Sequence, residues 1–228
     1  MTPLPPDEVH VWRTGLSPGD AELAAASSLL SPDERARADR FMMERSCVSF
    51  TAARAFLRRV LARYVAADPA ALAFRYTEFG KPSLATGGDL RFTLSHSGDL
   101  AVLAIARARE VGIDVEAIRP VDPHLPERFF SRREVAAIAA VPEPDRLAAF
   151  FRCWTRKEAF LKATGEGFNR SLASFAVTLG RHEPPAVSWV EDDPGEAARW
   201  QIAGLDLGPG YAGALASPSR GWRVRPMP

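Results

Sequence analysis

The sequence predicts an α+β protein made of two similar halves. Two capping boxes support this prediction, because Ser31 to Glu34 and Ser131 to Glu134 each pair a serine N-cap with a glutamate three residues later. In both halves a strand-like segment precedes the box, and a long helical segment and further strand-like segments follow it. We expect one unit over residues 1–108 and a second over 109–228, with the functional site in the cleft between them.

Local patterns define the elements of the first half. A strand is expected over residues 8–14, and a helix begins at the first capping box, where Pro32 suits the first turn. A longer helix over 44–67 follows, because apolar residues recur at helical spacing from Ala53 to Tyr64. Short strands are expected at 73–76, 91–95 and 100–106, with loops at 80–82 and 86–89.

The second half repeats this order. A strand is expected over residues 111–116, and the second capping box begins a helix. Residues 143–164 form a long helix that stops at Gly165. Strands return at 174–178, 186–190, 200–203 and 211–216, before a proline-rich, basic tail.

Composition excludes several classes of protein. Lysine and arginine total 29 against 28 for aspartate and glutamate, so the net charge of +1 argues against a dedicated nucleic-acid binder. The longest apolar stretches, such as 100–106, fall short of the roughly 18 residues that span a membrane. Cys47 and Cys153 are too few for a disulfide framework, and the N-terminus does not read as a secretory signal. We therefore expect a cytoplasmic protein without a membrane partner.

Two carboxylates lie on the strand expected at 111–116. Asp114 and Glu116 stand at i and i+2, so they share one face of the strand, about 7 Å apart. Such a pair is able to chelate a hard cation, and Mg²⁺ fits because it keeps waters and completes its shell with substrate phosphates. The alternative reading is a solvent-facing acidic pair on an edge strand.

A second stretch lies on the helix expected at 143–164. Trp154, Glu158 and Lys162 recur at i, i+4 and i+8 and line one stripe of that helix. Glu158 would supply a third carboxylate to the same cation, and Lys162 a positive charge against a charge that grows during reaction. The alternative is a salt-bridged surface with a partly buried tryptophan.

A third set of candidates is suited to phosphate. Ser95 and His96, at the end of a strand, offer hydroxyl and imidazole groups, and Lys81 lies in a Gly-Lys-Pro loop. A hydrolase triad is disfavoured, because adjacent Ser and His point to opposite faces of a strand and no nucleophile elbow surrounds the serine. Arg37 and Arg45 are candidate anion ligands, although arginines on helix faces are usually solvated.

Taken in order, four motifs resemble those of the 4′-phosphopantetheinyl transferase superfamily, and the likeness is closer to the large, monomeric surfactin-synthetase-activator (Sfp-like) type. The motifs are Gly80-Lys81-Pro82, Leu94-Ser95-His96-Ser97, Gly112-Ile113-Asp114-Val115-Glu116 and Trp154-x-x-Lys157-Glu158-Ala159-x-x-Lys162-Ala163-x-Gly165-x-Gly167. The resemblance implies two α/β halves about a pseudo-twofold axis, with coenzyme A in the cleft. It also implies the reaction of a holo-[acyl-carrier-protein] synthase: a serine of an apo acyl or peptidyl carrier protein accepts phosphopantetheine and 3′,5′-ADP departs.

The resemblance also implies roles for particular residues. By position, Asp114, Glu116 and Glu158 match the ligands of Mg²⁺, or of Mn²⁺ as the alternative ion. The positions that match coenzyme A contacts are Lys81, Ser95, His96 and Lys162. His96 and an amino-terminal arginine, for which Arg37 and Arg45 are the candidates, match positions near the 3′-phosphate. Our hypothesis gives catalytic roles to Glu158, which itself or through a metal-bound water that it orients takes the proton of the incoming serine, and to Lys162 at the departing phosphate.

Two other readings compete with the transferase. One is a non-catalytic coenzyme A-binding module that kept the fold and lost the chemistry. The other is a magnesium-dependent phosphohydrolase acting on a small nucleotide. Intact Asp114, Glu116, Glu158 and Lys162 argue against the first, because a decayed site would be expected to lose a carboxylate first.

Overall fold

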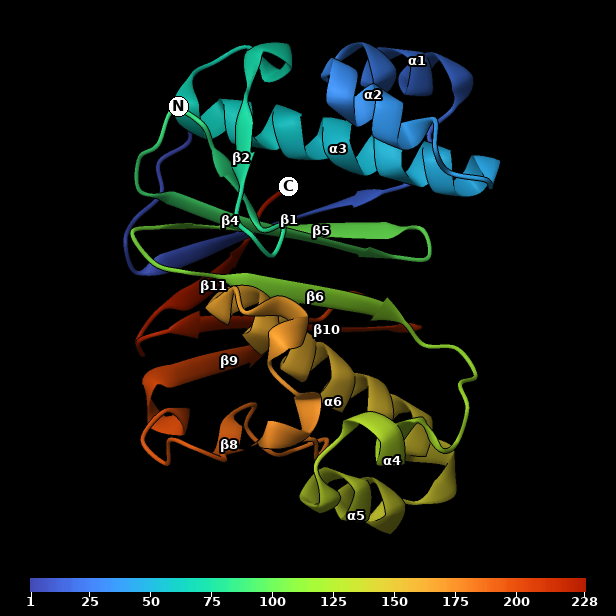
Figure 1. Ribbon diagram of the computed structural model, residues 1–228, viewed down its shortest axis with the longest axis vertical. Coiled ribbons are helices and arrows are strands. Elements are labelled where there is room, and N and C mark those ends of the chain that lie inside the picture. Colours follow the sequence, from blue (N-terminus) through green and yellow to red (C-terminus); the bar gives the residue numbers. More distant parts are fainter.

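The computed structural model describes the backbone of residues 1–228 and every side chain except that of Phe168. The first half of the chain begins with a strand and three helices and ends with two strands joined by a tight turn (Figure 1). Its elements are β1 (Glu8–Gly15), α1 (Asp20–Ser28), α2 (Pro32–Ala38), α3 (Glu44–Val65), β2 (Phe74–Tyr76), β3 (Pro82–Leu84), β4 (Leu90–Ser97) and β5 (Leu100–Arg107).

The second half follows the same plan and adds one strand at the C-terminus. Its elements are β6 (Gly112–Ala117), α4 (Leu125–Phe129), α5 (Arg132–Ala140), α6 (Glu143–Thr164), β7 (Phe175–Val177), β8 (Val187–Val190), β9 (Trp200–Gly204), β10 (Tyr211–Pro218) and β11 (Arg223–Pro226). The long helix α6 has the predicted bounds and stops at Gly165, whose left-handed backbone needs no side chain. Among the described residues, no helix is long and apolar enough to cross a membrane.

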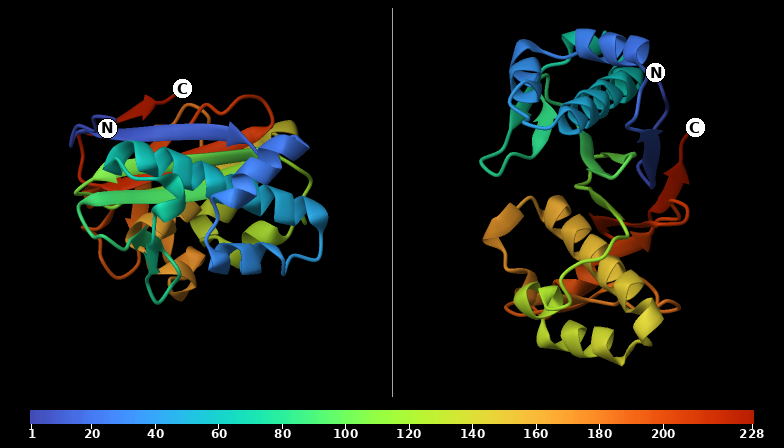
Figure 2. Two further views of the ribbon diagram at one scale, coloured as in Figure 1. Left: turned by 90° about the horizontal axis from the view of Figure 1, so that it is seen from above. Right: turned by 90° about the vertical axis from the view of Figure 1, so that its right-hand side faces the viewer.

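The elements stack in four layers: helix, sheet, sheet, helix (Figures 1 and 2). Alternate residues of β5 separate two cores, because Leu103 and Ile105 face α3 while Val102 and Ala104 face the second sheet. A third core fills the space between α6 and its sheet, around Phe160. The two sheets therefore pack face to face, and each long helix covers one outer face.

The sheets repeat one topology. The first has the order β11-β1-β5-β4 and the second β6-β10-β9, so in each half the first strand pairs antiparallel with the last. Small hairpins, β2-β3 and β7-β8, occupy matching places along the chain. This repeat confirms the predicted α+β fold of two similar halves.

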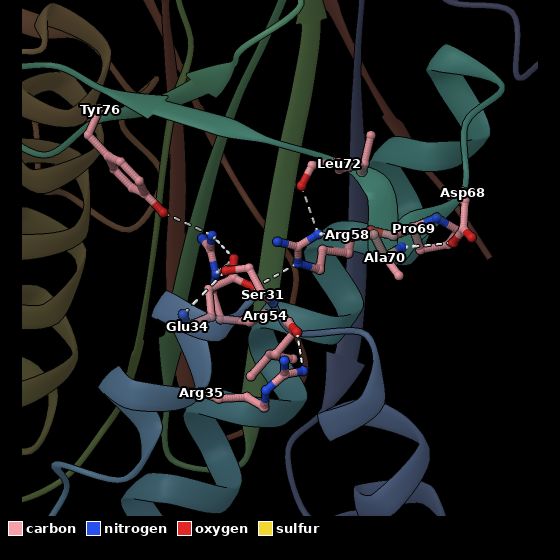
Figure 3. A network of polar contacts seen from close by, with 11 residues as sticks. Ser31, Glu34, Arg35, Arg54, Arg58, Asp68, Pro69, Ala70, Leu72 and Tyr76 are labelled. Carbon is pink, nitrogen blue, oxygen red and sulfur yellow. Dashed lines mark hydrogen bonds and ion pairs between the residues drawn. The ribbon is translucent and has the colours of Figure 1, made fainter.

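Both capping boxes anchor their long helix through a buried ion pair. In the first half Glu34 accepts hydrogen bonds from Arg54 and Arg58 of α3, the latter at 2.7 Å (Figure 3). Burial alone would raise the pKa of Glu34, but the two guanidinium groups hold it below its usual value. In the second half Glu134 accepts two bonds from Lys157 of α6, at 2.7 and 2.8 Å. Breaking either pair would leave a buried charge uncompensated, so each fixes its helix against its half.

The strand β6 and the helix α6 touch backbone to backbone at Gly112. A Cβ atom at this position would lie 2.0 Å from the carbonyl oxygen of Ala159 and 2.4 Å from the amide nitrogen of Ala163. No side chain fits there, since neither backbone atom can rotate away. The contact brings the strand that carries Asp114 directly against the helical turn that carries Lys162.

Four segments differ from the sequence prediction, and the short helix α4 is one that was not expected. Helix α1 was not expected, because its nine residues are mostly alanine and polar residues without a clear apolar stripe. The loop predicted at 80–82 leads into the short strand β3. The basic tail forms β11, which pairs parallel with β1, so the second unit expected over 109–228 extends back into the first sheet. Arg223 and Arg225 hold this strand by pairing with Glu8.

We predict that Gly112→Ala lowers the free energy of unfolding by about 3 kcal/mol, as overpacking a rigid contact does. The matched control is Gly204→Ala in the same sheet, where the nearest atom to an added Cβ is a proline carbon at 3.8 Å and little change is expected. Urea unfolding of the three proteins measures the difference. Equal stability of the two variants would contradict the close contact.

Candidate active site

The two halves meet where β4, the edge of the first sheet, runs beside β6, the edge of the second. The hydroxyls of three alternate residues of β4 bridge this seam. Thr93 donates to the carbonyl oxygen of Val111 at 2.6 Å. Ser95 and Ser97 accept from backbone N–H groups of β6 and donate to its carboxylates. Side chains therefore satisfy backbone groups of β6 that a neighbouring strand would otherwise bind.

Asp114 is the centre of the polar cluster at this seam. Its Oδ1 accepts from Lys162 Nζ at 2.6 Å and from Ser95 Oγ at 2.8 Å, and Lys162 also donates to Ser95 at 3.0 Å. Within the described part of the chain, its buried Oδ2 has no hydrogen-bond partner. A buried carboxylate oxygen without a partner is costly, so this atom is a candidate ligand position.

Glu116 and Glu158 add two half-buried carboxyl groups beside Asp114. Burial raises the pKa of Glu116, and the charge of Asp114 raises it further against the hydrogen bond from Ser97. Burial also raises the pKa of Glu158, with contributions from the charges of Asp114 and Glu116, while Lys162 lowers it. The three carboxyl groups are therefore close enough to repel one another, which favours binding of a cation.

Two other predicted residues lie near this cluster. His96 follows Ser95 on β4 and is an exposed residue. Desolvation of its imidazole and the neighbouring Lys162 ammonium lower the pKa of this group. Lys81 spans the two halves, because its Nζ bonds Glu110 at 2.6 Å and the carbonyl oxygen of Ala163 at 3.2 Å. Sequence reasoning missed Glu110, which lies in the junction between the halves and has no motif around it.

The two predicted arginines do not contact the Asp114 cluster. Arg45 is exposed and pairs with Asp99 at 3.1 Å, in the turn between β4 and β5. The Arg37 guanidinium lies over the ring of Phe50 and lines a cavity of about 390 Å³. The structure thus brings together Ser95, Asp114 and Lys162 by direct contact and Glu116, Glu158 and His96 by proximity, and it leaves Arg37 and Arg45 apart from them.

Comparison with known proteins identifies the family. Residues 14–108 match the profile described as 4′-phosphopantetheinyl transferase, N-terminal, and residues 110–216 match that of the 4′-phosphopantetheinyl transferase superfamily. The 4′-phosphopantetheinyl transferase HetI of Nostoc sp. is 36% identical over 96% of this chain and 91% of its own length. The chain belongs to the 4′-phosphopantetheinyl transferase superfamily.

Other members of the superfamily are similar over shorter spans. The 4′-phosphopantetheinyl transferase Sfp of Bacillus subtilis is 29% identical over 74% of this chain and 80% of its own. A solved structure of holo-[acyl-carrier-protein] synthase (AcpS) from Thermotoga maritima covers 49% of this chain and 63% of that chain, at 25% identity and a TM-score of 0.40. The relatives that match most of the chain confirm the two-domain, Sfp-type membership that the motifs predicted.

Members of this superfamily generally use Mg²⁺, and the cluster suits that ion. The three carboxylates predicted as ligands do not form a preformed metal site. In the described part of the chain, no group of three or more His, Cys, Asp or Glu residues is arranged to hold a metal. In this arrangement the Lys162 ammonium, at 2.6 Å from Asp114 Oδ1, already balances one carboxylate charge. Mg²⁺ needs only one or two carboxylates beside waters and substrate phosphates, and Asp114 Oδ2 is free to serve as one.

The raised pKa of Glu158 predicts a pH-dependent stability. Ionisation of this carboxyl opposes folding, so the penalty is absent below its ordinary pKa of 4.5 and grows as the pH rises through the higher folded value. We predict that Glu158→Gln raises the melting temperature at pH 8 in EDTA and that this gain shrinks toward pH 5. The control Glu191→Gln alters an exposed side chain and should leave the melting temperature unchanged at both pH 8 and pH 5. A lower melting temperature for Glu158→Gln at pH 8 would contradict the assignment.

Proposed function

We propose that this protein transfers the 4′-phosphopantetheine group of coenzyme A to a serine of an apo acyl or peptidyl carrier protein and releases 3′,5′-ADP. One observation carries the proposal: in a member of this superfamily, Lys162, Asp114 and Ser95 bond one another at the seam of the two halves, with Glu116 and Glu158 beside them. The serine comes from the partner, so the protein needs no nucleophile of its own.

Lys162 supplies the positive charge that the reaction requires. The bond from the serine oxygen to the β-phosphorus forms as the bond from that phosphorus to the bridging oxygen breaks, so negative charge grows on the departing phosphate. The ammonium is held by Asp114 and Ser95 and is about a third exposed, at 29% of its side-chain surface. An exposed ammonium fixed in place is able to stabilise that charge without reorganising. Mg²⁺, held by Asp114, Glu116 and Glu158, would neutralise the pyrophosphate oxygens.

Glu158 is proposed as the base that takes the serine proton. It stands one helical turn before Lys162 on α6, so the two side chains share one face. Burial raises its pKa above the ordinary value for glutamate, which makes the carboxylate a better proton acceptor. A base and a cation on one helical face would then act on opposite sides of the same phosphorus.

The remaining predicted ligands are assigned to the two ends of coenzyme A. Ser95 lies in the seam and Lys81 joins the two halves through Glu110 and Ala163, so both would contact the phosphates. His96, the next residue of β4, would lie near the 3′-phosphate, and its lowered pKa favours a neutral imidazole. Arg37, beside its cavity and stacked on Phe50, and Arg45 are the candidates for the 3′-phosphate. We further propose a monomer that works in the reducing cytoplasm, since its two cysteines are free thiols.

The first test is the intact mass of an apo acyl or peptidyl carrier protein after incubation with this protein, coenzyme A and Mg²⁺. We predict a gain of roughly 340 Da, one phosphopantetheine by its formula, that disappears with EDTA or with a carrier Ser→Ala variant. No gain on several carriers despite tight coenzyme A binding would favour the binding-module reading. Release of free phosphopantetheine without a carrier would favour the phosphohydrolase.

The second test concerns the two proposed catalytic residues. We predict that Glu158→Gln and Lys162→Ala each lower kcat at saturating coenzyme A by about 100-fold or more. The control Glu143→Gln changes an exposed carboxylate in the first turn of the same helix and should keep full turnover. Unchanged turnover in either active-site variant would remove the role assigned to that residue.

A further inference from the structure

We propose that Ser97 is a positioning residue whose hydroxyl, reaching across from the first half, holds the Glu116 carboxylate in place for the divalent ion. The inference rests on the proposed function, because it assigns Glu116 to that ion. It concerns a residue that contacts a ligand-bearing side chain and takes no part in the reaction itself. Three features of the seam carry it: the geometry at Ser97, the difference between Asp114 and Glu116, and the alternation along β4.

The hydroxyl of Ser97 both donates and accepts a hydrogen bond between the two halves. Its Oγ donates to Glu116 Oε2 at 2.7 Å and accepts from the amide of Ala117 at 3.1 Å. The hydrogen bond from the Ala117 amide fixes the position of the Ser97 oxygen, and the hydroxyl proton is then directed to the Glu116 carboxylate. A donor held by backbone in this way orients the carboxylate rather than following it.

Glu116 depends on this bond more than Asp114 depends on any single one. Oδ1 of Asp114 accepts from both Ser95 and Lys162. Ser97 is the only hydrogen-bond donor to the Glu116 side chain within the described residues. Glutamate also has one more rotatable bond than aspartate and loses more rotamer freedom when it is fixed. Removing the Ser97 hydroxyl would therefore allow the Glu116 side chain to populate several rotamers.

The neighbouring hydroxyls of β4 show that the seam alone does not require a bond to a carboxylate. Thr93, Ser95 and Ser97 are alternate residues and face β6 with the same spacing. Thr93 donates to the backbone carbonyl of Val111, the residue just before β6, whereas Ser97 donates to a carboxylate. Thr93 thus provides a matched case in which a hydroxyl joins the halves without touching a proposed ion ligand.

The experiment compares Ser97→Ala with Thr93→Val in the full-length protein. The direct readout is the binding of Mn²⁺, followed by the electron paramagnetic resonance signal of the free ion, with coenzyme A present and no carrier. We predict about 10-fold weaker Mn²⁺ binding for Ser97→Ala, the size typical of losing a partner of a metal ligand. Thr93→Val should bind the ion like the wild type and lose only thermal stability.

Kinetics then separate positioning from a role in substrate binding. The Mg²⁺ concentration for half-maximal transfer should rise about 10-fold in Ser97→Ala, with kcat at saturating Mg²⁺ and the KM for coenzyme A nearly unchanged. Ser97→Cys keeps the shape of serine with a weaker donor, so its Mg²⁺ concentration for half-maximal transfer should lie between those of the wild type and Ser97→Ala. If Ser97→Ala does not fold, the Mn²⁺ affinity of Ser97→Cys tests the inference instead, and wild-type affinity in that variant overturns it.

Each outcome bears on one claim. Wild-type affinity for Mn²⁺ in Ser97→Ala, or an equal loss in Thr93→Val, overturns the inference while wild-type transfer leaves the proposed function intact. A raised KM for coenzyme A with unchanged ion binding also overturns it, since Ser97 would then act on the substrate. If the wild-type protein itself transfers no phosphopantetheine, the proposed function has failed, and the inference fails with it.

Discussion

The contact between β6 and α6 at Gly112 is the constraint on which the site depends. A helix normally packs on a sheet through side chains, about 10 Å away, but here the strand backbone lies against the backbone of the helix. Asp114 lies two residues after Gly112 on β6, and at this separation its short side chain reaches the ammonium of Lys162 on α6. An alanine at position 112 would push the strand outward, and the ammonium would lose the carboxylate that fixes it.

The seam between β4 and β6 makes the site a shared property of the two halves. The second half supplies the charged groups, namely Asp114, Glu116, Glu158 and Lys162, while the first supplies the hydroxyls of Ser95 and Ser97. The carboxylates repel one another and have raised pKa values at Glu116 and Glu158, so the folded protein holds them together at a cost. Face-to-face packing of the sheets and the buried ion pairs of Glu34 and Glu134 offset that cost far from the site.

The sequence predicted the features that depend on local patterns. The capping boxes, the bounds of α6 and the shared face of Asp114 and Glu116 follow from spacing along the chain. Features that depend on a distant partner could not be predicted. Lys162 was expected to face a substrate charge, and its bond to Asp114 arises only when β6 meets α6. Strand β11 forms because β1 offers an open edge with Glu8, which a proline-rich tail with two arginines does not reveal.

The repeated topology would by itself create two equivalent seams, and β11 adds a strand to the first sheet at the second of them. By the repeat, the counterpart of the β4-β6 seam would lie between β9, the other edge of the second sheet, and β1. There β11 pairs with β1, and Gln201 of β9 bonds the backbone of Gly221 and Trp222 just before that strand. The side chain of Gln201 thus bridges the two sheets as Ser95 and Ser97 do, but its hydrogen-bond partners are backbone groups only. Arg223 and Arg225 of β11 pair with Glu8, so two guanidinium groups balance this buried carboxylate.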